Sequence, residues 1–135
     1  MIRIVLADDH AQFRAYLRAL LEQQPGLCVV GEAAHGQAAI DLLRDWGAGP
    51  LPDVLLMDVE MPGIGGVEAT RAIRAARPSV GVIALSLHHD PHMVAAMREA
   101  GASAYLVKGD PLPELVQAIT RVAGGAGPSA SRHPG

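Results

Sequence analysis

Five short apolar runs, rich in valine, isoleucine and leucine, recur along this sequence and decide its fold class. They occupy residues 4–7, 27–30, 54–57, 82–85 and 104–107. Their hydrophobicity is continuous rather than alternating, as a strand requires when both of its faces are buried. Strands of this kind occur in parallel sheets that are covered by helices on both sides. The sequence therefore predicts a buried parallel sheet.

Longer segments with helical periodicity separate and follow these runs. In each segment, apolar residues recur three and four positions apart, which is the pattern of an amphipathic helix. The segments cover residues 13–21, 38–46, 67–76, 91–100 and 112–122. Asp90 and Pro91 predict the start of the fourth helix, and Gly101 predicts its end. Five repeats of strand and helix predict an α/β, doubly wound sheet with right-handed crossovers.

The length of 135 residues fits one domain. We expect this domain to cover residues 1–122, and residues 123–135, which are rich in glycine, proline and serine, to form a flexible linker or tail. The net charge of −3 argues against a nucleic-acid-binding surface, which is normally basic. Cys28 is the one cysteine, and no apolar stretch reaches the length of a membrane span. Both features suit a cytoplasmic protein without a membrane partner.

Polar side chains stand at the end of four of the five apolar runs. Asp8 and Asp9 follow the first run, Asp58 the third, Ser86 the fourth and Lys108 the fifth. In open parallel α/β sheets, ligands bind outside the carboxyl ends of the strands. If the first and third strands are neighbours, three carboxylates converge on one crevice, with a hydroxyl and an ammonium group beside them.

Carboxylates this close together need a compensating cation, because they repel one another when all are ionised. Mg²⁺ suits such a crevice because it prefers hard oxygen ligands and bridges to phosphate oxygens. One carboxylate can then attack a phosphoryl group and form an acyl phosphate. The metal and Lys108 would neutralise the charge on the transferring oxygens. The sequence thus predicts Mg²⁺-dependent aspartyl-phosphate chemistry.

Over residues 2–122 the sequence resembles the receiver domains of two-component response regulators, which are CheY-like. The residues that carry the resemblance follow one another at strand ends: Asp8, Asp9, Asp58 within residues 55–63, Ser86, Tyr105 and Lys108. The resemblance implies a flavodoxin-like parallel sheet of five strands in the order 2-1-3-4-5, with five helices.

The resemblance also implies how the phosphoryl group and the metal are held. Asp58 would be the phosphoacceptor, and Lys108 would form a salt bridge with the phosphoryl group. Asp9 would bind Mg²⁺ directly, Asp8 largely through water, and Glu60 through its backbone carbonyl. The phosphoryl donor would be a sensor histidine kinase. The chain would catalyse its own phosphorylation and dephosphorylation and would not be an enzyme for other substrates.

Signal output is implied by the same resemblance. Ser86 would hydrogen-bond a phosphoryl oxygen, and Tyr105 would be an aromatic switch that turns inward when Ser86 moves toward the phosphate. The change would remodel the face made by the fourth helix, the fifth strand and the fifth helix, and a homodimer would form there or nearby.

Three segments resemble one branch of the family, the NarL, FixJ and LuxR type. They are residues 29–33, 84–88 and 100–108. Members of this branch usually carry a C-terminal helix-turn-helix domain, which this sequence lacks. We therefore expect control of transcription, with DNA contacted through such a domain beyond the tail.

Two other functions stay open. A receiver could act as a protein-interaction module without phosphorylation. A metal-dependent phosphohydrolase on a similar sheet often has a second acid two residues beyond its nucleophile, and Glu60 stands there, although Met61 and Pro62 follow it instead of a catalytic hydroxyl.

Histidines near the site allow a metal interpretation of their own. His88, His89 and His92, with Asp90, could suggest zinc. If the helix begins at Pro91, however, these histidines do not share one helical face, so a solvated loop is the preferred interpretation. The same interpretation is preferred for His10, which follows the acid pair at the rim of the site.

Overall fold

The computed structural model describes residues 1–125, in which five strands and five helices alternate. The strands are β1 (Ile2–Ala7), β2 (Leu27–Ala33), β3 (Val54–Asp58), β4 (Gly81–Ser86) and β5 (Ala104–Val107). The helices are α1 (Ala11–Glu22), α2 (Gly36–Arg44), α3 (Gly66–Ala76), α4 (Pro91–Ala100) and α5 (Leu112–Ala123). The final helix ends one residue past its predicted end. Most of the predicted tail, residues 126–135, lies outside the described residues.

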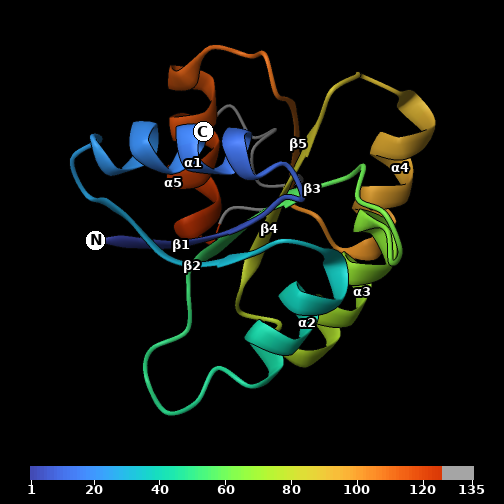
Figure 1. The fold of residues 1–135 in the computed structure, drawn as a ribbon, viewed down its shortest axis with the longest axis horizontal. Helices are drawn as coiled ribbons and strands as arrows, with labels where there is room; N and C mark the ends of the chain where they lie inside the picture. Colours follow the sequence, from blue (N-terminus) through green and yellow to red (C-terminus); the bar gives the residue numbers. More distant parts are fainter. Residues whose placement is uncertain (126–135) are drawn as a thin grey trace.

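All neighbouring strands are parallel, and their order in the sheet is β2-β1-β3-β4-β5. This confirms the fold class and the strand order that the family resemblance implied. Helices α1 and α5 cover one face of the sheet, and α2, α3 and α4 cover the other (Figure 1). Successive side chains of β1 point to opposite faces of the sheet, as they do along any strand. Ile4 packs with α1 and α5, whereas Val5 packs with α2 and α3.

The central strands are buried on both faces, as their continuous hydrophobicity predicted, but the edge strands are not. Every residue of β3 is buried, and so are most residues of β1 and β4. In β2, buried and half-buried residues largely alternate, and β5 is half-buried throughout. The difference follows from the strand order, since β2 and β5 each have one neighbour. Because an edge strand does not need to be apolar throughout, β2 also continues three residues past the end of its apolar run.

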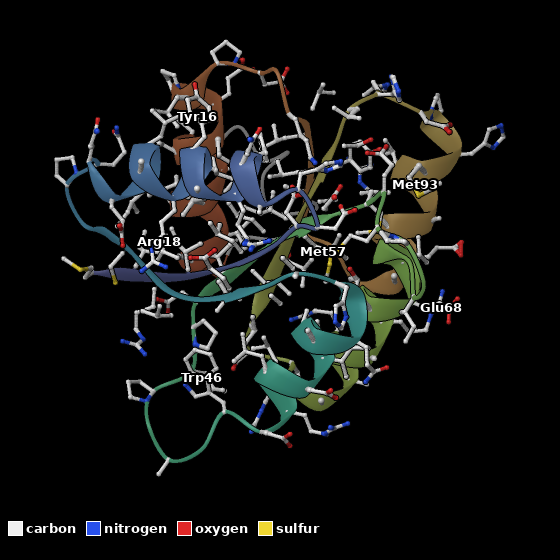
Figure 2. All side chains as sticks on the ribbon, in the orientation of Figure 1. Tyr16, Arg18, Trp46, Met57, Glu68 and Met93 are labelled. Carbon is white, nitrogen blue, oxygen red and sulfur yellow. The ribbon has the colours of Figure 1, made fainter. Side chains whose placement is uncertain are left out.

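Capping residues set the ends of two helices. Asp90 caps α4 by accepting from the backbone N–H of His92 at 2.9 Å, and Gly101 ends the helix with a φ of +114°, which confirms both predictions. Helix α2 begins two residues earlier than predicted, because His35 Nδ1 accepts from the backbone N–H of Ala38. Trp46 lies beyond that helix, where its indole N–H donates to a loop carbonyl (Figure 2).

The register of the sheet brings the polar strand ends to one edge. Ala7 pairs with Met57, so the residues that follow β1 lie beside the last residue of β3. Met57 is fully buried near the centre of the fold (Figure 2), and Asp58, the next residue, pairs with Leu85 of β4. None of the described helices is both long enough and apolar enough to cross a membrane.

Gly66, the first residue of α3, allows this helix to approach the chain just after β3. A Cβ at this position would lie 2.9 Å from the carbonyl oxygen of Asp58 and 2.9 Å from the Cα of Val59. Backbone atoms cannot rotate away from such a contact, so Gly66→Ala should lower the free energy of unfolding by about 1–3 kcal/mol. Urea denaturation measures the change.

Gly49→Ala is the matched control, because a Cβ there has no atom within 4 Å. Its free energy of unfolding should stay within about 0.5 kcal/mol of the parent value. Equal effects of the two substitutions would contradict the close approach of α3.

Candidate functional site

Asp58 lies at the carboxyl end of β3 and is fully buried. Its Oδ1 accepts from the backbone N–H of Glu60 at 3.1 Å and lies 3.3 Å from Nζ of Lys108. Its Oδ2 is buried and has no hydrogen-bond partner among the described residues. Burial, together with the nearby charge of Asp8, raises the pKa of Asp58 to about 6, although Lys108 opposes the shift. Asp58 is therefore a carboxylate held in a costly environment, with one oxygen free to react or to bind.

Lys108, directly after β5, joins this carboxylate to the acid pair. Its Nζ lies 2.9 Å from Oδ2 of Asp8 and 3.3 Å from Oδ1 of Asp58, and its side chain is almost fully buried. The ammonium also lies 4.8 Å from the centre of the Phe13 ring, within cation–π range. Burial alone would lower the pKa of Lys108, but its hydrogen bond to Asp8 and the charge of Asp58 raise it overall. The lysine thus stays charged between two carboxylates.

The acid pair completes a cluster of metal-ligating atoms. Asp8, Asp9, His10 and Asp58 each offer a ligand atom, and these atoms lie within 4.8 Å of one another. Besides Oδ2 of Asp58, Oδ1 of Asp9 is buried without a hydrogen-bond partner. Three carboxylates face one ammonium group here, so the donor set and its unpaired oxygens fit a hard divalent cation such as Mg²⁺. The structure does not test Glu60 as a backbone ligand, and this role stays a prediction.

Ser86, the last residue of β4, is buried beside the cluster, but its hydroxyl is already in use. Its Oγ donates to Oε2 of Glu60 and accepts from the backbone N–H of His88 at 3.1 Å. The other carboxylate oxygen of Glu60 accepts from the backbone N–H of Leu87 at 3.1 Å. The exposed Glu60 side chain therefore accepts two hydrogen bonds from the start of the loop after β4. The sequence patterns did not predict this contact.

Tyr105 lies in β5 with its side chain half-buried. Its hydroxyl donates to the backbone carbonyl of His88 at 3.2 Å, and its ring meets the His89 ring edge-on with centroids 6.3 Å apart. The tyrosine thus contacts the same loop that is hydrogen-bonded to Glu60. Its role as a switch stays a prediction.

An ion-pair network behind the acid pair was also missed in the sequence analysis. Arg14 of α1 donates through Nη1 to the backbone carbonyl of Asp8 and through Nε to Glu32 of β2 at 2.7 Å. Arg18, labelled in Figure 2, binds the same glutamate. Burial would raise the pKa of Glu32, but its hydrogen bonds from Arg18 and Arg14 lower it below the usual range. The one signal in the sequence is the four-residue spacing of the arginines, which places them on one helical face.

The histidines differ in where the structure places them. Among residues 1–125, the acid cluster with His10 is the one group of potential metal ligands, and His88, His89 and His92 do not belong to it. His10 does lie at the rim, with 61% of its side chain exposed and Nδ1 pointing at the acid pair. Its exposure agrees with the preferred interpretation of His10 as a solvated residue, and the structure adds its close approach, 3.4 Å, to both aspartates.

Known proteins are similar to this chain in sequence and in fold. Residues 4–120 match the family model described as response regulator receiver domain. The chain is 43% identical over 125 residues to the response regulator UvrY of Escherichia coli K12, and 39% identical over 124 residues to the transcriptional regulatory protein DegU of Brevibacillus brevis. These alignments cover 93% and 92% of this chain but 56% and 51% of the two relatives. The chain thus spans about half of their length.

A solved structure extends the comparison to three dimensions. It is the signal receiver domain of the putative response regulator NarL from Mycobacterium tuberculosis. The two structures superimpose with a TM-score of 0.83 at 35% sequence identity, covering 92% of this chain and 97% of that one.

The raised pKa of Asp58 makes stability depend on pH. Because this pKa is about 6 when folded and 3.8 for the free side chain, the folded protein binds more protons than the unfolded chain between these values. Wild-type stability is therefore lost as pH rises through about 6. Asp58→Asn cannot ionise, so in metal-free buffer it should be more stable than wild type at pH 7.5, by on the order of 2 kcal/mol, and about equal at pH 4.

Urea denaturation at the two pH values measures this difference. Asp45→Asn serves as the control, because Asp45 is exposed and lies outside the cluster. It should change stability equally at both pH values. A pH-independent effect of Asp58→Asn would show that burial does not raise the pKa of this group.

The hydrogen bond from the backbone N–H of Leu87 to Glu60 predicts that this amide is protected from hydrogen exchange. Glu60→Ala removes the acceptor of that N–H, and a hydrogen bond of about 1 kcal/mol corresponds to exchange roughly fivefold faster. Glu68→Ala is the control, because this exposed glutamate lies on α3, away from the loop (Figure 2). Exchange at Leu87 that is insensitive to both substitutions would exclude the contact. Amide exchange followed by NMR resolves the residue.

Proposed function

Since the chain belongs to the response regulator receiver domains of two-component systems, we propose that it accepts a phosphoryl group on Asp58 from a sensor histidine kinase in a Mg²⁺-dependent reaction. The observation that carries the proposal is the state of Asp58. It is fully buried, one of its oxygens has no hydrogen-bond partner among the described residues, and a charged lysine lies 3.3 Å from the other oxygen. This is the environment that a nucleophilic carboxylate needs beside a cation.

In the proposed transfer, a carboxylate oxygen of Asp58 forms a bond to phosphorus. The bond between phosphorus and the donor atom of the kinase breaks, and its electron pair leaves with the donor. The product is an acyl phosphate on Asp58. Lys108 stays close enough to pair with the new phosphoryl oxygens, which carry more charge than the carboxylate did.

The residues that would hold Mg²⁺ are Asp8, Asp9 and Asp58, together with the backbone carbonyl of Glu60. When bound, the ion would neutralise charge on the transferring oxygens. Ser86 would donate to a phosphoryl oxygen after leaving the carboxylate of Glu60. The chain would therefore act on itself, without turnover of a separate substrate.

The proposed output is a shift between two conformations. Movement of Ser86 would release the loop after β4, and Tyr105 would turn inward behind it. The face made by α4, β5 and α5 would then change, and a homodimer would form there or nearby. The relative DegU is named a transcriptional regulatory protein, and this chain spans about half of it. Control of transcription in the cytoplasm through a helix-turn-helix domain of a longer protein is thus part of the proposal.

Labelling of the chain with a small phosphodonor tests the proposal. With Mg²⁺ and acetyl phosphate, the protein should gain one acid-labile phosphoryl group, detected by intact mass. Asp58→Asn should abolish the gain, because it removes the nucleophilic oxygen, and chelation of Mg²⁺ should do the same.

Asp53→Asn is the matched control. Asp53 lies at the other end of β3, where it accepts from the backbone N–H of Arg3, and an asparagine oxygen can still accept there. This variant should be labelled like wild type. Labelling of the Asp58→Asn protein would rule out Asp58 as the acceptor. A wild-type chain that is never labelled would instead favour an interaction module that works without phosphorylation.

A further inference from the structure

His10 holds its imidazole against the acid pair without making a hydrogen bond to Asp9. Its Nδ1 lies 3.4 Å from Oδ1 of Asp8 and 3.4 Å from Oδ1 of Asp9. Good N–H···O hydrogen bonds measure about 2.7–3.2 Å, and Oδ1 of Asp9 has no hydrogen-bond partner among the described residues. The imidazole is thus aimed at two carboxylate oxygens that it does not fully satisfy.

The two distances of 3.4 Å from Nδ1 of His10 match the spacing of neighbouring ligands around one metal ion. Two ligands bound tetrahedrally at 2.0–2.2 Å from an ion lie roughly 3.3–3.6 Å apart. A carboxylate oxygen of Asp58 belongs to the same cluster, in which all ligand atoms lie within 4.8 Å of one another. Lys108 contacts the other oxygens of Asp8 and Asp58. Oδ1 of Asp9 and Oδ2 of Asp58 therefore lie near the imidazole nitrogen without a hydrogen-bond partner among the described residues. Oδ1 of Asp8 accepts from the backbone N–H of His10 at 2.7 Å and keeps a second lone pair for a metal ion.

A second observation points to a cation at this place. Asp58 is fully buried, yet its Oδ2 has no partner among the described residues. A buried charged oxygen in this state costs several kcal/mol unless a positive charge approaches it. Lys108 is already engaged by the opposite oxygen, at 3.3 Å.

We propose that this pocket also binds Zn²⁺, with His10 as a nitrogen ligand beside Asp8, Asp9 and Asp58. Mg²⁺ takes hard oxygen ligands, whereas imidazole suits zinc and its neighbours in the transition series. Neither the family assignment nor the predicted Mg²⁺ site uses His10. The proposal rests on the proposed function, because it extends the same acid pocket.

The two ions would have opposite effects on the pocket. Four protein ligands complete the tetrahedral coordination of Zn²⁺, as in closed structural zinc sites, whereas reactive sites keep one position open. With His10 bound, no position on the ion remains for a phosphoryl oxygen, and Asp58 is itself a ligand. Zn²⁺ would therefore hold the receiver in an unreactive form, and His10 would make it sensitive to this ion.

Titration of the chain with Co²⁺ alone tests the proposal, because Co²⁺ replaces Zn²⁺ and absorbs visible light strongly when four-coordinate. Wild type should show these bands, and added Zn²⁺ should displace them. His10→Gln should lose them and should bind Zn²⁺ at least about tenfold more weakly. His92→Gln removes an imidazole outside the cluster and should behave like wild type. Circular dichroism checks that each variant is folded.

Two results would overturn the inference. One is an identical Co²⁺ spectrum and Zn²⁺ affinity in wild type and His10→Gln. The other is Zn²⁺ binding that Asp58→Asn leaves unchanged, since the ion would then lie elsewhere. Mg²⁺-dependent labelling of the same wild-type preparation separates the two proposals. Labelling without the Co²⁺ bands refutes the zinc site alone, and Co²⁺ bands without labelling refute the proposed phosphoryl transfer alone.

Discussion

Mutual repulsion of three carboxylates at the end of β1 and β3 is the constraint around which the rest of this site is arranged. The sheet places Asp8 beside Asp58, and burial leaves neither of them well solvated. Lys108 contacts both and offsets part of the cost. The remaining negative charge favours cations in the pocket. Together with burial, which has the larger effect, the charge of Asp8 raises the pKa of Asp58 above that of a free aspartate. A site built this way is incomplete without a further positive charge.

Side chains around the pocket restrain Asp8, Lys108 and Ser86. Arg14 ties α1 to the backbone of Asp8, and Phe13 covers one side of the lysine. On the opposite side, Glu60 takes the hydroxyl of Ser86. In the proposed reaction, a phosphoryl group competes with Glu60 for the single proton of that hydroxyl. Phosphorylation at the end of β3 would therefore affect the loop after β4, because Ser86 would have to exchange its hydrogen bond to Glu60 for one to the phosphoryl group.

Sequence patterns predicted those features that depend on position along a strand or helix. Continuous apolar runs located the three central strands, and the rule that parallel strands end at one edge brought Asp58 and Lys108 together. The apolar run predicted a β2 strand that is too short, because an edge strand tolerates exposed residues such as Glu32. Contacts between side chains of distant elements, such as Glu60 with Ser86, leave no periodic trace in the sequence. They depend on how two loops approach each other, and this is decided by packing.

The half-buried edge strand β5 has a mechanical consequence for Lys108, which directly follows it. This strand has four residues and pairs with β4 alone. A force on the lysine side chain therefore acts on the strand that the sheet restrains least, and α4 and α5 are attached to its two ends. The same force on β3 would have to disturb pairing on both sides. The sheet thus holds Asp58 on a strand that is paired on both sides, and it holds Lys108 after a strand that is paired on one side and can move more easily.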